Sequence, residues 1–203
     1  LGDVYKRQGV SHCAKPNSFF KILFNKNITQ IDTIPNLKKY YSKGIEEKGI
    51  LVVGIGAGAR YKMLKPNLYA KILKIFINKK NIKKIFLLGA GDRDIKYLGE
   101  LKKYIDFKDF NIQNLVNKVF LDESIDIISN CEYYLGFDSG LFHVAASLKI
   151  KTFGIFTKIN EFSHNNWKNV TIFCGKPCIS NKNEYFGNSE LNNISLDEVE
   201  KLL

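Results

Sequence analysis

The chain has 203 residues, of which 45% are hydrophobic and 25% are charged, and its formal net charge is +11. This balance is ordinary for a globular protein and excludes a fibrous or disordered chain. No apolar run approaches the roughly 20 residues of a membrane span, and four scattered cysteines are too few for a disulfide scaffold.

The basic charge does not by itself indicate nucleic-acid binding. Arginine is the side chain that best reads bases and grips phosphates, and the chain has only Arg7, Arg60 and Arg93. Lys, Ile and Asn, whose codons are rich in A and T, are all abundant. We therefore expect no nucleic-acid partner, a solvated basic surface as the default, and attraction to anionic lipid as a secondary expectation.

The first residues look foreign to the rest of the chain. Asp3 to Gln8 is what GAT GTG TAT AAG AGA CAG encodes, the transposon end used in sequencing-library adapters. We expect residues 1–8 to be non-native, with a native N-terminal tail as the alternative. Residues 9–48 then read as the remnant of an N-terminal domain with a linker, and residues 49–203 as one folded domain.

From residue 49 onward, short apolar runs alternate with amphipathic stretches. Buried strands are expected at 50–53, 85–88, 112–115, 133–137, 152–156 and 170–173. Helices are expected from Pro66, at 95–104, 121–129 and 139–148, and from Ser195. In the helix 121–129, Leu121, Ile125 and Ile128 are expected to face the core.

This alternation predicts an α/β fold, a Rossmann-like parallel sheet with helices on both faces. In such sheets, ligands bind at the carboxyl ends of the strands. Two strand ends carry unusual chemistry: the glycine loop after residue 53 and the segment that begins at Asp138.

The glycine loop, Gly54 to Ala59, is similar to a dinucleotide fingerprint. In a dinucleotide-binding fold, however, the helix starts directly after the glycine loop. Here the helix is expected to begin only at Pro66, seven residues after Ala59. No Gly-Lys-Ser/Thr follows, so the loop is not a P-loop. The remaining interpretations are a backbone that approaches a phosphate, with Arg60 and Lys62 beside it, and a plain tight turn.

The second strand end reads Asp138-Ser139-Gly140-Leu141-Phe142-His143. Ser139 and Gly140 would offer backbone N–H groups and the positive end of a helix dipole, which suit a pyrophosphate. Asp138 is expected to face sugar hydroxyls or a cation, and His143 can donate to a phosphate oxygen. The alternative is an N-cap with a core histidine. A hydrolase elbow fits poorly, because the serine stands one position too late.

No metal site is expected. His12, His143 and His164 are far apart, and Cys174 with Cys178 has no second pair to complete a zinc site.

Four segments together resemble glycosyltransferase family 9, the ADP-heptose:lipopolysaccharide heptosyltransferases. The D-[ST]-G-x-x-H-x-A-A motif is the specific one and is present without departure. The chain departs from the family pattern in the first segment, where Leu64 replaces a tryptophan and Lys65 a proline, and in the second, which lacks a glutamate. The four segments are Gly56 to Lys65, Gly89 to Asp94, Lys118 to Leu121 and Asp138 to Ala146.

The resemblance implies the C-terminal half of a GT-B glycosyltransferase, with the acceptor and the general base on an N-terminal domain that precedes it. The expected reaction is inverting transfer of a sugar, heptose from ADP-heptose, to a lipopolysaccharide core or another lipid-linked glycan. The expected location is cytoplasmic, with peripheral contact at the anionic inner face of the membrane. No cofactor or metal is implied beyond the nucleotide-sugar donor.

The resemblance also implies a role for each matching residue. The catalytic pair is Lys62, which neutralises charge on the donor phosphates, and Asp138, which holds the transferred sugar. The donor-binding residues are Gly56 and Gly58 in the phosphate loop, Asp94 for the ribose with Asp92 as a competitor, Val119 for the base, and Ser139, Gly140 and His143 for the pyrophosphate.

Two other functions stay open on the sequence. One is a nucleotide-binding domain without catalytic activity, and the other is an NAD-type oxidoreductase domain, which the late helix start disfavours.

Overall fold

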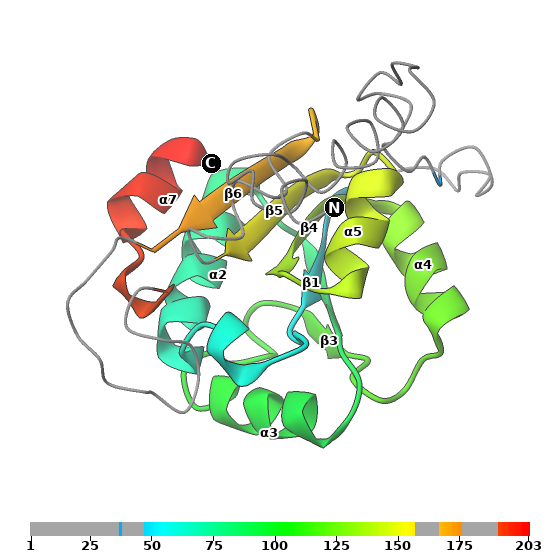
Figure 1. Ribbon diagram of the computed structural model, residues 1–203, viewed down its shortest axis with the longest axis horizontal. Helices are drawn as coiled ribbons and strands as arrows, with labels where there is room; N and C mark the ends of the chain where they lie inside the picture. The colour runs from blue at the N-terminus through cyan, green and yellow to red at the C-terminus, as the bar shows by residue number, and fades with distance from the viewer. Residues whose placement is uncertain (1–36, 38–46, 157–166, 176–190) are drawn as a thin grey trace, which may run out of the picture.

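The computed structural model describes residues 37, 47–156, 167–175 and 191–203 (Figure 1). The expected adapter-derived segment 1–8 and nearly all of the expected linker 9–48 lie outside these residues. His12, His164 and Cys178 also lie outside them.

Six parallel strands form one sheet in the described part of the chain, as the alternating pattern predicts. Their order across the sheet is β3-β2-β1-β4-β5-β6, the order of a doubly wound Rossmann-type sheet. Their apolar runs are continuous because both faces of the sheet are covered. The strands are β1 (Glu47–Gly54), β2 (Lys84–Leu88), β3 (Ile112–Asn114), β4 (Cys131–Phe137), β5 (Lys151–Phe156) and β6 (Val170–Cys174).

Helices cover both faces of this sheet, with α4 and α5 on one side and α2 and α7 on the other (Figure 1). Pro66 occupies the first turn of α2, where its missing N–H costs nothing. Ser195 caps α7 by accepting a hydrogen bond from the backbone N–H of Glu198 at 3.4 Å. The helices are η3 (Arg60–Lys62), α2 (Pro66–Lys80), α3 (Asp92–Leu101), α4 (Leu121–Ser129), α5 (Gly140–Ser147), η4 (Leu191–Asn193) and α7 (Leu196–Leu202).

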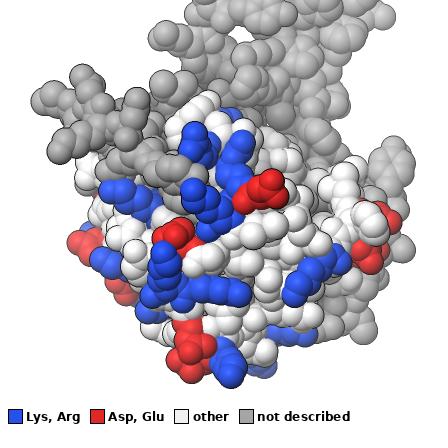
Figure 2. Space-filling view, turned by 90° about the horizontal axis from the view of Figure 1, so that it is seen from below, with Lys and Arg blue, Asp and Glu red and all other residues white. Residues whose placement is uncertain are grey.

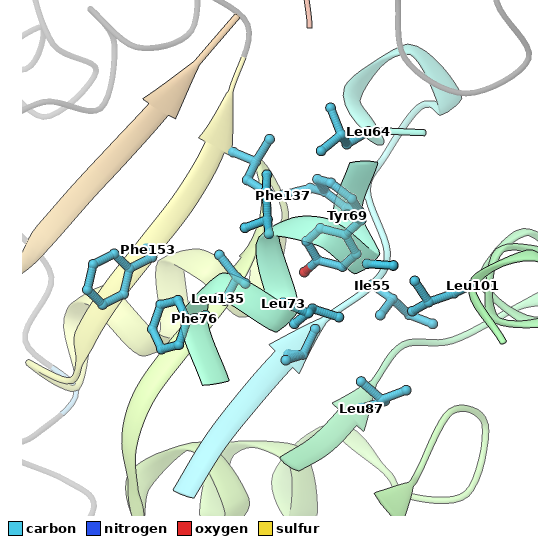
Figure 3. Packing of buried hydrophobic residues seen from close by; sticks show 14 of the residues in the cluster. Ile55, Leu64, Tyr69, Leu73, Phe76, Leu87, Leu101, Leu135, Phe137 and Phe153 are labelled. Carbon is cyan, nitrogen blue, oxygen red and sulfur yellow. The ribbon is translucent and has the colours of Figure 1, made fainter. Parts of the chain in front are cut away.

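The larger core lies between the sheet and the layer of α2, α3 and α7 (Figure 3). Aromatic rings fill much of it: Phe76 meets Phe153 edge to face at 4.9 Å between ring centroids, and Tyr69 meets Phe137 at 4.8 Å. A second apolar cluster packs α4 and α5 against the opposite face and includes Tyr134 of β4. These two cores hold the carboxyl ends of the central strands in fixed positions.

The centre of the sheet is its topological switch point. β1 and β4 are neighbours, and Gly54 at the end of β1 is aligned with Gly136 near the end of β4. The chain leaves β1 toward β2 and leaves β4 toward β5, so the two connections diverge and open a crevice above these strand ends.

Two expectations about helices were wrong. The helix expected at 95–104 is α3, which begins at Asp92, because its first turn is polar and follows Gly91, which has a φ of 88°. Leu121 does not face the core: its exposed fraction is 64%. It is the first residue of α4, and the helix packs through Ser124 and Ile128 instead. No helix among the described residues is long and apolar enough to cross a membrane.

Candidate functional site

A cavity of about 730 Å³ lies at the carboxyl ends of β1, β2 and β4. Ligand pockets commonly enclose about 300–1,000 Å³, so it can hold a nucleotide. Most of its lining comes from loops and helix starts that follow these strands. The lining residues are Gly54, Gly56–Gly58, Gly89–Asp94, Val119, Leu121, Ser124, Ser139–Leu141 and Val144.

One wall of the cavity is formed by the two glycine loops that follow β1 and β2, with the buried carboxylate of Asp94 packed against both. Oδ2 of Asp94 accepts a hydrogen bond from the backbone N–H of Ala90 at 2.8 Å. A Cβ at Gly56 would lie 2.1 Å from the same oxygen, and one at Gly89 would lie 2.8 Å from it. Glycine is therefore required at position 56, because any side chain would displace the carboxylate that holds the loop after β2.

Gly58 differs from Gly56 in its surroundings. It is exposed, and nothing lies within 4 Å of the position that a Cβ would take. The guanidinium of Arg93 donates to the carbonyl of the preceding Ala57 at 2.8 Å and holds the loop toward α3. The backbone at Gly58 is thus open to a ligand in the cavity.

The two acids proposed for a ribose lie in different environments. Burial raises the pKa of Asp94 above its ordinary value, while the Ala90 N–H and the charge of Arg93 act against the shift. Asp92 is exposed and also lines the cavity. Oδ2 of Asp94 already accepts from the N–H of Ala90 in the loop after β2, whereas Asp92 is exposed to solvent.

The opposite wall is the start of α5. Ser139 is the N-cap residue in extended conformation, yet its side chain makes no capping hydrogen bond. The first N–H groups of a helix have no intrahelical acceptor and carry the positive end of the dipole. Ser139, Gly140 and Leu141 line the cavity, so this end of α5 can receive an anion there.

Beside the cavity, a cluster of three side chains links η3 to the end of β4. Nζ of Lys62 lies 2.6 Å from Oδ2 of Asp138, and Nε2 of His143 lies 3.8 Å from the other carboxylate oxygen. The side chain of Asp138 is only 11% exposed, and that of Lys62 is 26% exposed. His143 is partly exposed, so the alternative of a core histidine is wrong.

The structure thus brings the predicted residues together in two neighbouring groups. Six of them line the cavity, and Lys62, Asp138 and His143 form the adjacent cluster. In the ligand-free structure Asp138 forms an ion pair with Lys62, which was expected to face the donor phosphates. The six that line the cavity are Gly56, Gly58, Asp94, Val119, Ser139 and Gly140.

Part of the cavity lining is apolar. Val119, Leu121, Leu141 and Val144 form this part. Apolar side chains favour a flat nucleobase over a charged group, so this part of the lining suits an aromatic base.

Basic side chains, with some acidic ones among them, lie on the side of the molecule that carries α3. α3 is lowest in Figure 1, and the view of that side in Figure 2 shows Lys and Arg side chains gathered in the middle of the face. Arg60 and Arg93 are exposed in the segments after β1 and β2. Among the described residues, no three His, Cys, Asp or Glu side chains gather as a metal site.

Sequence reasoning missed two residues near the cavity. Arg93 was not assigned to the site, although a lone arginine in a glycine loop is a signal that could have identified it. Tyr134 lies within an apolar strand, where no pattern marks its hydroxyl as different from its neighbours.

The family model described as glycosyltransferase family 9 (heptosyltransferase) matches residues 24–190. Lipooligosaccharide heptosyltransferase 2 from two Campylobacter jejuni strains is 24% identical to the chain over 136 residues, which are 67% of this chain and 43% of each relative.

Solved structures show the same fold. The ADP-heptose LPS heptosyltransferase II of E. coli superposes with a TM-score of 0.62 at 18% identity, covering 82% of this chain and 48% of that one. A family 9 glycosyl transferase from Veillonella parvula gives a TM-score of 0.60 at 16% identity, covering 95% and 51%. E. coli heptosyltransferase WaaC with ADP-2-deoxy-2-fluoro heptose gives 0.59 at 14% identity, covering 88% and 51%. The chain spans about half the length of these proteins, and the Rossmann-like fold is confirmed.

Proposed function

Because the chain belongs to glycosyltransferase family 9, the heptosyltransferase family, we propose that it binds the nucleotide-sugar donor of a GT-B glycosyltransferase. The proposed donor is ADP-heptose, and the proposed reaction is inverting transfer of the heptose to a lipopolysaccharide core or a related glycan. The observation that carries the proposal is the cavity at the switch point, which has a helix N-terminus on one side and an open glycine loop on the other.

The diphosphate would lie between α5 and the loop after β1. Ser139 and Gly140 offer N–H groups at the positive end of α5, and Gly58 leaves room for the backbone to approach a phosphate oxygen. Lys62 lies beside this position and supplies a point charge.

The nucleoside would extend toward the apolar part of the cavity. Val119 offers its backbone to the base, and Leu121 offers an apolar surface. Asp94 holds the ribose in this proposal, with Asp92 as the second acid within the same lining.

The transferred sugar would lie next to Asp138, whose carboxylate accepts from sugar hydroxyls. In the reaction, a hydroxyl oxygen of the acceptor forms a bond to the anomeric carbon while the bond from that carbon to the diphosphate oxygen breaks. The proton of that hydroxyl passes to a general base, which the proposal assigns to the N-terminal domain that precedes this one in the family. The electron pair leaves with the diphosphate, and the α5 N–H groups, Lys62 and His143 stabilise its negative charge. Loss of one such preorganised group typically costs about 10²–10³ in rate.

The proposed acceptor is a lipid-linked glycan, which implies that sugar transfer takes place at the inner face of the cytoplasmic membrane. A net charge of +11 supports contact with anionic lipid, because each basic residue near such a surface contributes about 1 kcal/mol.

Calorimetric titration of the chain with ADP, UDP, GDP, NAD and adenosine tests the donor assignment. We expect binding of ADP that is tighter than binding of adenosine, since the diphosphate has its own contacts. Lys62→Ala should weaken the binding of ADP more than the binding of adenosine. The control Lys74→Ala, which removes an exposed charge from α2, should change neither affinity. Binding of NAD without any nucleoside diphosphate would overturn the proposal in favour of an oxidoreductase domain.

A further inference from the structure

Tyr134 places a hydroxyl directly behind the wall of the cavity. Its side chain belongs to the apolar cluster beneath α4 and α5. A Cβ at Gly54 would lie 2.1 Å from its hydroxyl oxygen, and a Cβ at Gly136 would lie 2.7 Å from it. These two glycines are aligned in β1 and β4, and together they make the space that the hydroxyl fills.

This hydroxyl has no hydrogen-bond partner among the residues that the structure describes, and the tyrosine is fully buried. A buried polar group without a partner costs about 1–3 kcal/mol, so such groups are rare in folded proteins. Burial raises the pKa of Tyr134, and the nearby Ser139 hydroxyl opposes the shift. The phenol therefore stays protonated and can donate.

The side chain of Ser139 is near enough to Tyr134 to lower the pKa of the phenol, although the Tyr134 hydroxyl makes no hydrogen bond in the ligand-free structure. Ser139 also makes no capping bond with its side chain. Ser139 and Gly54 both line the cavity, and the hydroxyl of Tyr134 lies behind Gly54.

We propose that Tyr134 is a positioning residue for the diphosphate: its hydroxyl donates to Oγ of Ser139, and the Ser139 hydroxyl donates to a phosphate oxygen. A serine oxygen can accept one bond while its proton is given to another group, and successive hydrogen bonds strengthen one another. The inference rests on the proposed function, because it needs a ligand that accepts from Ser139.

The chemistry of the position supports this role over a purely structural one. Phenylalanine would place the same ring in the same cluster and would leave no polar atom unpaired. The tyrosine hydroxyl lowers the stability of the ligand-free chain and is used only when an acceptor reaches Ser139.

The test is Tyr134→Phe in the full chain, with three readouts: the ligand-free Tm and the calorimetric Kd values for ADP and adenosine. We expect a Tm that is unchanged or higher, because the unpaired hydroxyl is gone. We expect ADP to bind roughly threefold to tenfold more weakly, the size of one lost hydrogen bond, and adenosine to bind as before.

Two further variants separate positioning from packing. Ser139→Ala combined with Tyr134→Phe should bind ADP as Ser139→Ala does alone, because Tyr134 acts through Ser139. The matched control is Tyr69→Phe: that hydroxyl is also buried and donates to the carbonyl of Gly54 at 3.4 Å, from the opposite core. It should lower the Tm and leave the ratio of the ADP and adenosine Kd values unchanged.

Unchanged ADP binding in Tyr134→Phe overturns this inference and leaves the proposed function intact. A lower Tm with equal weakening of ADP and adenosine also overturns it, since that is the result of lost packing. If the wild-type chain binds neither ADP nor another nucleoside diphosphate, the proposed function fails and the inference fails with it.

Discussion

Lys62 and Asp138 form an ion pair that joins the segment after β1 to the end of β4, with 2.6 Å between Nζ and Oδ2. The two residues are 76 positions apart in the sequence. The carboxylate of Asp138 neutralises the charge of Lys62 in the ligand-free chain. A phosphate that enters the cavity therefore competes with Asp138 for the same ammonium group.

Asp138→Asn should bind ADP about threefold to tenfold more tightly than the wild-type chain. The amide keeps the size of the side chain and removes the charge that holds Lys62, so the ammonium can turn to the phosphates at lower cost. Calorimetry at low and at high salt measures the change, and the gain should shrink as salt screens the interaction.

In a restored full-length enzyme, Asp138→Ala should abolish sugar transfer while ADP binding remains. The carboxylate would be needed for the sugar and not for the nucleotide. Comparison of product formation with ADP binding checks this, and wild-type turnover in the variant contradicts the sugar role.

Gly56→Ala and Gly58→Ala form a matched pair of substitutions within one loop. At position 56 the new Cβ would lie 2.1 Å from Oδ2 of Asp94, whereas at position 58 it meets nothing within 4 Å. Gly56→Ala should lower the free energy of unfolding by about 1–3 kcal/mol, the usual cost of overpacking, because the buried carboxylate of Asp94 has to move. Gly58→Ala should leave the free energy of unfolding unchanged. It should weaken the binding of ADP more than the binding of adenosine, because the Cβ occupies space that the phosphate needs.

Thermal unfolding measures the stability of both variants, and calorimetry measures their affinities for ADP and adenosine. If Gly58→Ala binds ADP like the wild-type chain, the loop is a plain tight turn rather than a phosphate contact.

Much of the fold could be predicted because each strand is a continuous apolar run between turn residues. Val53 and Leu135, for example, lie in such runs and are paired in neighbouring strands. The first turn of α3 was missed because apolar periodicity cannot detect a polar turn that begins at Asp92. Leu121 was placed in the core because periodicity predicts which face of a helix is buried. It does not predict how far along the helix the surface that buries this face extends.

The site was predictable only in part. Gly58 and Ser139 lie in motifs at strand ends, where the sequence itself marks them. The pairing of Lys62 with Asp138 depends on how two loops lie side by side, and no local pattern contains it. The position of the unpaired Tyr134 hydroxyl depends on the space left by Gly54, a residue of another strand.

Asp94→Asn should change how stability depends on pH. The pKa of Asp94 is raised from its ordinary value of 3.8 in the folded chain, mainly by burial. The folded state therefore holds this proton more tightly than the unfolded state, so the contribution of Asp94 to stability falls as pH rises from 3.8 through the folded pKa. An asparagine oxygen can still accept from Ala90 without this loss.

Urea unfolding of both proteins between about pH 4 and pH 8 measures the difference. The stability of the variant relative to wild type should increase with pH across this window and then level off. Parallel curves would show that Asp94 has the same proton affinity in both states.

Leu121→Ala should weaken nucleoside binding without destabilising the chain. Leu121 is 64% exposed and lines the apolar part of the cavity, so its side chain contributes little to the core. We expect a change in the free energy of unfolding within about 0.5 kcal/mol. Both ADP and adenosine should bind roughly threefold to tenfold more weakly, because a buried methylene contributes about 0.8 kcal/mol and part of the side chain is covered by the base.

Two controls make this result specific to the cavity. Phe120→Ala removes a more exposed apolar side chain, 81% exposed, that does not line the cavity, and it should leave both Kd values unchanged. Ile128→Ala, in the buried face of the same helix, should lower the free energy of unfolding by about 2–5 kcal/mol. Equal weakening of ADP and adenosine binding in Leu121→Ala, set against the selective weakening of ADP binding in Lys62→Ala, would show that Leu121 contacts the nucleoside and Lys62 the diphosphate. Unchanged binding of adenosine in Leu121→Ala would instead place the base away from α4.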